Sequence, residues 1–370
     1  MQRILSASKD TYITNKIINN TFRATDANVG QAGTLDLFKI HGESKLSGSS
    51  EDQTEISRLL LYFDTSPVSR MQSDAKIDIN DSTFKCFVKL HDVYGGQTTP
   101  ENFNLILFPL SKSFDEGSGY DVSSFRDVTS VNFVTASVTS GVPNLWNTAG
   151  AQKSGSLGSE NIDIIVSGNL SGPSGTSYTS LSPVQHFITG EEDLIFDVTK
   201  IVSGTITGQI PDHGYLIAFS GSLEHNGSTY FVKRFASRNA SNTAIRPKLI
   251  VRYDDSLHDS HEDFIFDVSS SLYLNNFHQG AAANIRTGTA ATELSGENVM
   301  KLKIESGSFK KMFDVSQAQR GINRITGVYS ASFAISSFAT DNVNGDSLKK
   351  HIAKSGSILF DEIWTSSNEE

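Results

Sequence analysis

The sequence contains a single cysteine, Cys86, and this scarcity excludes two ways of holding a fold together. One thiol cannot form an internal disulfide, and a structural zinc site based on cysteine needs more than one. Cys86 lies among the apolar residues of 84–90, so we expect a buried and unreactive thiol. The fold must therefore be held by packing and hydrogen bonds.

Basic residues and long apolar runs are also scarce. Lys and Arg number 31 against 41 Asp and Glu, which gives a net charge of −10. Nucleic-acid binding needs a basic face, so no nucleic-acid partner is expected. No apolar run approaches the roughly 20 residues of a membrane helix, and residues 1–10 lack the apolar core of a signal peptide. We expect a protein made in a cytoplasm, with no membrane partner and no export signal of its own.

Helical periodicity is weak, whereas strand patterns recur along the whole chain. With 29 Gly and only 8 Pro, turns are formed mainly by Gly, Asn, Asp and Ser. Apolar and polar residues alternate with a period of two, which is typical of a strand with one buried face. Strands are predicted at residues 10–13, 35–40, 58–64, 84–90, 103–110, 162–166, 194–198, 215–219, 230–235, 248–253, 264–268, 298–306, 322–333 and 357–364. Short helical segments are predicted only at 197–201 and 346–353.

The chain is predicted to form two domains. Residues 230–235 and 248–253 are interpreted as the closing hairpin of the first domain. Five of the ten residues in 254–263 are acidic, which favours a solvated linker. We therefore predict an all-β chain with a jelly-roll-like β-sandwich over 1–254, an acidic linker over 255–263 and a second, smaller β-sandwich over 264–370.

Residues 111–182 are rich in aromatic side chains but irregular in pattern, and they are predicted to form a long loop insertion. Long ordered loops usually serve function or interaction. Candidate partner contacts are Phe114, Tyr120, Phe125, Trp146 and Tyr178, together with Trp364 near the C-terminus. The alternative is that each ring covers an open edge of its own sandwich. The interaction hypothesis predicts that deletion of 142–159 leaves a folded protein that no longer assembles.

Motifs of catalysis and metal binding are missing from the sequence. It contains no G-x-S-x-G, P-loop or H-E-x-x-H motif. Calcium could be held by Asp115 and Glu116 or by the acidic residues 191–193, and a metal by His258 and His261, but solvated loops are the favoured interpretation for all three. We predict no catalytic residue, no metal site and no cofactor.

Several short motifs, in order along residues 1–254, resemble the DNRLRE family of jelly-roll-like β-sandwich modules, found in cell-wall, carbohydrate-binding and phage proteins. The closing segment Phe235-Ala236-Ser237-Arg238-Asn239, followed by Arg246 and Pro247, is the most specific of them. The others are Asp10 to Ile13, Asn28-Val29-Gly30, residues 58–64 and 103–110, Asp115-Glu116-Gly117 and residues 193–198. Residues 321–333 and 355–364 are similar to β domains of large tailed phages.

These features together predict a non-enzymatic structural protein of a tailed bacteriophage virion, located at the neck, tail or baseplate. Such a protein would contact other virion proteins in multiple symmetric copies. The alternative is a carbohydrate-binding module of a fibre or cell-surface protein, in which Tyr120, Trp146 and Tyr178 would stack on sugar rings.

Overall fold

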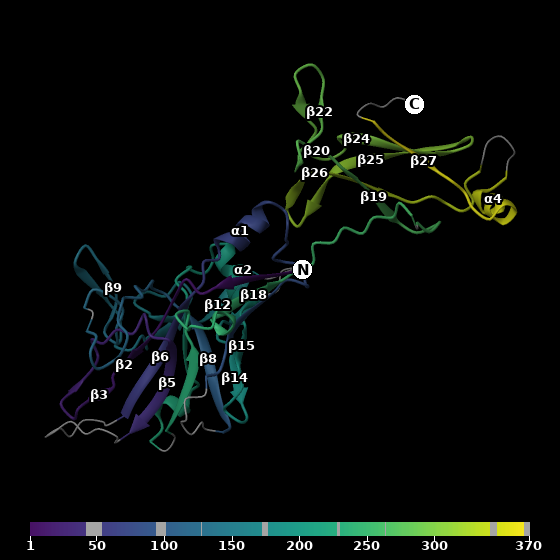
Figure 1. The fold of residues 1–370 in the computed structure, drawn as a ribbon. Coiled ribbons are helices and arrows are strands. Elements are labelled where there is room, and N and C mark those ends of the chain that lie inside the picture. Colours follow the sequence, from purple (N-terminus) through teal and green to yellow (C-terminus); the bar gives the residue numbers. More distant parts are fainter. Residues whose placement is uncertain are drawn as a thin grey trace. The chain divides into compact units, whose positions relative to one another are not determined.

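The computed structural model describes residues 1–41, 54–93, 101–126, 128–171, 177–227, 230–262, 264–340 and 346–365. The protein is all-β, and its chain divides into two compact units (Figure 1). The first unit comprises Met1–Ser69 and Ile79–Tyr253, and the second comprises Arg70–Asp78 and Asp254–Glu370. Residues 70–78, which interrupt the sequence of the first unit, thus belong to the second.

A seven-stranded antiparallel sheet forms one layer of the first unit's sandwich. Its central strand β6 is flanked by β16, β5 and β2, and Leu59, Leu60 and Leu61 of β6 are fully buried. Burial on both faces explains why this strand has a continuous apolar run instead of alternation. The strands are β14 (Val184–Phe187), β8 (Phe103–Pro109), β16 (Tyr215–Phe219), β6 (Thr54–Tyr62), β5 (Thr34–His41), β17 (Phe231–Ala236) and β2 (Lys9–Thr14).

The second layer is a four-stranded sheet in the order β1 (Gln2–Ser6), β18 (Lys248–Arg252), β7 (Lys85–Leu90) and β15 (Leu194–Asp197). The predicted closing hairpin is wrong, because β17 pairs with β5 in the seven-stranded sheet whereas β18 lies between β1 and β7. Alternation shows that one face of a strand is buried, but it does not specify the partner. Cys86 of β7 is buried, as expected, and burial raises the pKa of its thiol.

The edge strands β14 and β15 of the two sheets are joined through one side chain. The Gln185 amide donates from Nε2 to the Asp193 carbonyl oxygen (2.9 Å), and its Oε1 accepts from the Ile195 backbone N–H (2.6 Å). These are backbone groups of the kind that an added strand would pair with. Gln185 therefore protects an edge that would otherwise be open.

The predicted loop insertion over 111–182 is corrected by the structure, which contains strands there and a large share of the core. The strands are β9 (Thr135–Thr139), β10 (Val142–Leu145), β11 (Ser154–Ser156), β12 (Ile164–Ser171) and β13 (Ser177–Ser180). Phe114, Phe133, Trp146 and Ala151 pack in one hydrophobic cluster with strand residues such as Leu60. Deleting 142–159 would remove Trp146 and Ala151 from this cluster, so the deletion is now expected to prevent folding.

Helices are short. The helix α1 (Ser66–Ser73) was not predicted. The helix α2 (Thr199–Ile206) lies near the predicted turn, and Asp197 Oδ1 accepts a hydrogen bond from the Thr199 N–H at 2.9 Å. The remaining small elements are α3 (Ser222–His225), the 3₁₀ helix η2 (Thr243–Ile245) and the hairpin β3 (Ile17–Ile18) with β4 (Phe22–Arg23). In the described ranges, every helix is too short or too polar to cross a bilayer.

A five-stranded antiparallel sheet is the centre of the second unit. Its order is β19 (Ser270–Asn275), β26 (Asn323–Phe333), β25 (Phe309–Arg320), β24 (Met300–Ser306) and β27 (Asp361–Thr365). The long strand β25 was missed. The strand predicted at 264–268 is wrong, because Phe266 and Asp267 form a turn and Ile265 and Val268 are exposed. Smaller elements are β20 (Phe277–His278) with β21 (Ala281–Ala282), β22 (Arg286–Thr287) with β23 (Thr292–Glu293), and α4 (Leu348–Ser355).

Hydrogen bonds attach two other segments to this second unit. The Arg320 guanidinium donates to the carbonyl oxygens of Ala75 (3.1 Å), Lys76 (2.9 Å) and Asp255 (2.7 Å). In the acidic stretch, Ser260 is buried and its backbone N–H donates to the Ser271 carbonyl oxygen of β19 (2.9 Å). Part of the stretch predicted as a linker is therefore fixed on the second unit.

Candidate functional site

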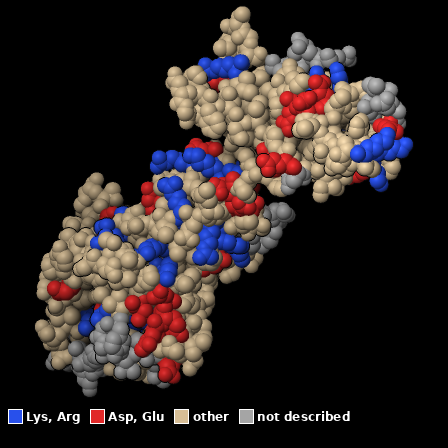
Figure 2. Space-filling model, turned by 45° about the vertical axis from the view of Figure 1, so that its right-hand side comes forward, with Lys and Arg blue, Asp and Glu red and all other residues tan. Residues whose placement is uncertain are grey.

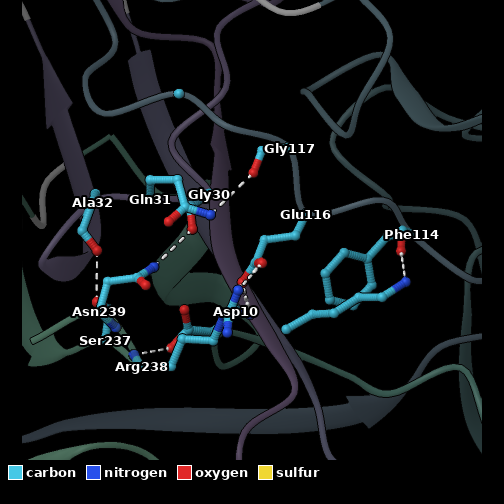
Figure 3. Close-up of polar contacts among 12 residues, drawn as sticks. Asp10, Gly30, Gln31, Ala32, Phe114, Glu116, Gly117, Ser237, Arg238 and Asn239 are labelled. Atoms are coloured by element: carbon cyan, nitrogen blue, oxygen red, sulfur yellow. Dashed lines mark hydrogen bonds and ion pairs between the residues drawn. The ribbon is translucent and has the colours of Figure 1, made fainter.

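The motifs singled out in the sequence meet in one polar cluster of the first unit (Figure 3). The Arg238 guanidinium forms a bidentate ion pair with Glu116, with Nε–Oε1 and NH2–Oε2 distances of 2.5 Å. Glu116 Oε1 also accepts from the backbone N–H of Asp10 (2.8 Å), and Asp10 Oδ2 accepts from the backbone N–H of Arg238 (2.6 Å). The segments around Asp10, Glu116 and Arg238, which are far apart in the sequence, are thus held together by these hydrogen bonds.

Asn28 and two glycines determine how the loops of this cluster approach one another. Asn28 Nδ2 donates to the carbonyl oxygens of Glu116 and Val131, both at 2.8 Å, and Asn28 Oδ1 accepts from the Gly119 N–H at 2.9 Å. A Cβ on Gly119 would collide with the Asn28 carbonyl oxygen, and one on Gly30 with the Glu116 carbonyl oxygen. Glycine is required at both positions because the backbones are in close contact.

Asp10 is the electrostatically unusual residue of the cluster. It is 1% exposed, and its Oδ1 has no hydrogen-bond partner among the described residues. Burial raises its pKa to about 7, the Arg238 backbone hydrogen bond opposes that rise, and the negative charge of Glu116 adds to it. A carboxylate enclosed in this way holds loops together and is not open to a substrate. We therefore interpret the cluster as structural.

The six predicted contact residues have different environments. Phe114 (1% exposed) and Trp146 (4% exposed) are core residues, and Trp146 Nε1 donates to the Asn132 carbonyl oxygen at 3.1 Å. Neither can reach a partner or stack on a sugar, which corrects that part of the prediction. Their burial was missed because isolated core residues in irregular backbone have no periodicity.

The other four candidates differ in accessibility. Tyr120 (61% exposed) and Phe125 (38% exposed) are at the surface, with ring centroids 5.4 Å apart. Trp364 is half-buried against the core of the second unit. Tyr178 lies on β13, opposite Leu170 in the strand register, and its side chain is outside the described residues.

The hairpin of β9 and β10 presents apolar residues that the sequence analysis did not single out. All four residues of β10 are exposed, including Val142 (68%) and Leu145 (53%). The next residue, Trp146, is in the core, so the hairpin is anchored at its base. Exposed apolar side chains on an anchored hairpin are candidates for an interaction surface. Val142 and Leu145 lie within the predicted loop, in a run of four residues that is too short to show the alternation of a strand.

A small polar cavity of about 170 Å³ lies in the first unit and is lined by Lys9, Tyr62, Ser113, Phe114, Asp212 and His213. Lys9 Nζ donates to the Phe114 carbonyl oxygen at 2.8 Å and lies 5.9 Å from the centroid of the Tyr62 ring. Burial raises the pKa of Asp212 and lowers that of His213. These residues come from segments that show no common motif, so sequence reasoning could not have grouped them.

The acidic residues considered as metal ligands are engaged with protein groups. Asp115 accepts from the Val138 N–H (3.1 Å), and Asp193 pairs with Lys89 (3.1 Å). His261 lies between Asp259 and Glu362. Within the described part of the chain, no three His, Cys, Asp or Glu side chains are placed to hold a metal ion.

On the face shown in Figure 2, groups of Lys and Arg lie between groups of Asp and Glu. The sequence matches no model of a known protein family and no curated protein.

Proposed function

We propose that this chain is a non-enzymatic structural protein that acts through protein–protein contacts in a tailed bacteriophage particle, at its neck, tail or baseplate. The β9–β10 hairpin carries the proposal, because it holds Val142 and Leu145 in solvent on a base fixed by Trp146. Burying either side chain against a partner would contribute about 1.5–3 kcal/mol. The placement in a phage is supported by the all-β architecture, the acidic composition and the sequence resemblances.

Edge protection supports contact through side chains instead of strand addition. Gln185 occupies the Asp193 carbonyl oxygen and the Ile195 N–H at β15, so a strand added there would have to displace its side chain. An exposed apolar hairpin allows repeated copies to associate through a defined surface. Tyr120 and Phe125 provide a second exposed apolar pair in the same segment of the chain.

A charge placed on the hairpin should disrupt assembly. The variants Val142→Asp and Leu145→Asp should remain folded, because both residues are exposed, but their incorporation into particles should fall by about tenfold or more as a charge replaces an apolar contact. Quantitative mass spectrometry of purified particles measures incorporation. The matched control is Ile188→Asp, which changes an exposed apolar residue (63%) elsewhere in the first unit. Unchanged incorporation of both hairpin variants would refute this surface, and absence of the chain from the particles would refute the virion role.

A second candidate function, carbohydrate binding, is favoured by the polar cavity around Lys9 and Asp212. Its lining offers the Tyr62 ring, the Lys9 ammonium group and the Asp212 carboxylate. A ring can stack on a sugar, and the two charged groups can form hydrogen bonds with its hydroxyls. The prediction is that the full chain binds polysaccharide of the host surface and that Asp212→Asn weakens binding by about tenfold. Glu160→Gln, at an exposed position, is the control. Lack of binding on a glycan array would remove this candidate.

A further inference from the structure

The two edge strands of the second unit's sheet are connected by one short segment. The Ser260 N–H donates to the Ser271 carbonyl oxygen on β19, while His261 Nε2 lies 3.0 Å from Glu362 Oε2 on β27. Ser260 and His261 are neighbours in sequence, whereas β19 and β27 are the opposite edges of a five-stranded sheet. The sheet must therefore curl until both edges reach the same segment.

A cavity of about 320 Å³ lies inside this curl. Leu272, Ile304 and Phe333 form its buried part, and Phe264, Phe266 and Phe360 form walls that are only half-buried. The ring centroids of Phe264 and Phe360 are 5.4 Å apart, so the walls form a connected aromatic surface. The volume and the apolar lining match those of small-molecule sites, which also occur in the mouths of curled β-sheets.

Polar groups line the same cavity and are mainly acidic. They are Ser260, His261, Glu262 and Glu362, and Asp259 contacts His261 at 2.6 Å. Burial opposes a positive charge on His261, but hydrogen bonding to Asp259 and the charge of Glu362 raise its pKa overall. Even with a protonated imidazole, carboxylates outnumber cations here.

Basic residues of α4 do not cancel this acidity. Ile352 of α4 lines the cavity, but Lys350 and Lys354 pair with Asp346 at 3.5 and 2.5 Å. Lys349 lies 5.9 Å from the centroid of the Phe338 ring. The cavity therefore favours a ligand whose polar end is positively charged.

We propose that this cavity binds a small amphipathic amine, with its apolar part against the phenylalanine rings and its ammonium group at Glu262 and Glu362. Aromatic faces attract cations as well as apolar groups, so the lining suits both ends of such a molecule. A charge-assisted hydrogen bond from ammonium to carboxylate supplies the orientation. The site is independent of the assembly surface in the first unit.

The test uses the full chain and three probes of equal chain length, namely octylamine, octanol and octanoate, in calorimetric titrations near neutral pH. Octylamine should bind most tightly, octanol more weakly, and octanoate at least about tenfold more weakly than octylamine. Absence of binding by octylamine would overturn the proposal. Equal or tighter binding of octanoate would overturn it as well, because the carboxylates would then have no role.

Two variants locate the ammonium group. Glu262→Gln, at an exposed side chain, and Glu362→Gln should each weaken octylamine binding about five- to tenfold and leave octanol binding unchanged. Glu297→Gln is the control, since its side chain is 74% exposed and it does not line the cavity. Circular dichroism verifies that each variant is folded. Unchanged octylamine affinity in both variants would show that the amine does not sit at these carboxylates.

Discussion

Replacing Arg58 with alanine should lower the free energy of unfolding of the first unit by roughly 3–5 kcal/mol. Arg58 and Glu224 are both buried, with Nε–Oε1 and NH2–Oε2 distances of 2.8 and 2.6 Å. Arg58 also donates to the Gly150 carbonyl oxygen, which connects β6 to the segment that carries Trp146. Alanine would leave the Glu224 carboxylate buried without its cation. The effect is large because the cost of burying that charge would no longer be offset by the ion pair.

Urea unfolding measures this loss. In a Trp364→Phe background, Trp146 is the remaining tryptophan, so its fluorescence reports the first unit alone. Arg126→Ala is the control, because its ion pair with Asp26 is exposed and should contribute less than about 1 kcal/mol. The double variant Arg58→Met with Glu224→Leu should recover much of the stability, since it removes both charges. Equal stability of Arg58→Ala and Arg126→Ala would contradict the interpretation.

Asp10→Asn should flatten the dependence of the first unit's stability on pH. The folded-state pKa of Asp10, about 7, lies above its unfolded value of 3.8, because burial disfavours the ionised form. The associated stability is fully present below pH 4 and is lost as pH rises through 7. Between pH 5 and pH 8 the native protein should lose about 2–3 kcal/mol from this residue, an order-of-magnitude figure. Asparagine cannot ionise, and its Oδ1 can still accept from the Arg238 N–H.

The measurement is the same urea titration at pH 5 and pH 8. Asp10→Asn should already be somewhat more stable than the native protein at pH 5, because the unfolded Asp10 is ionised there, and its advantage should grow by about 2–3 kcal/mol between pH 5 and pH 8. The charged groups acting on Asp10 are Glu116, Arg238 and Arg246, and all remain in the variant. Glu160→Gln, an exposed carboxylate of the same unit, should leave the pH slope unchanged. A native pH slope in Asp10→Asn would show that Asp10 is not the titrating group.

Strand positions could be predicted from the sequence where side chains alternate, but strand partners could not. Residues 103–110 and 248–253 were placed correctly because one face of each strand is buried. β17 and β18 were predicted to pair because the connection between them is short. In the structure they belong to different sheets. β25 was missed because Lys310, Lys311 and Gln317 interrupt its apolar pattern.

That residues 111–182 contact a partner stays a prediction, but two of the side chains predicted to make the contact are buried. Aromatic residues were predicted as contacts because aromatic side chains dominate interfaces. Phe114 and Trp146 are instead core residues. The exposed residues Val142 and Leu145 are small and lie in a short run without periodicity. Whether a residue in irregular backbone is buried depends on strands that are distant in the sequence. A local sequence pattern therefore cannot predict it.

The pairing of β1 with β18 has a consequence for the order of folding. Gln2 lies opposite Arg252, so the first strand of the unit is held by the last. During synthesis, the four-stranded sheet cannot be completed until residue 252 has left the ribosome. The backbone of β1 remains unpaired until then. Contacts between residues so distant in sequence slow folding. The unpaired backbone of β1 is therefore a point at which nascent chains can associate wrongly before the sheet closes.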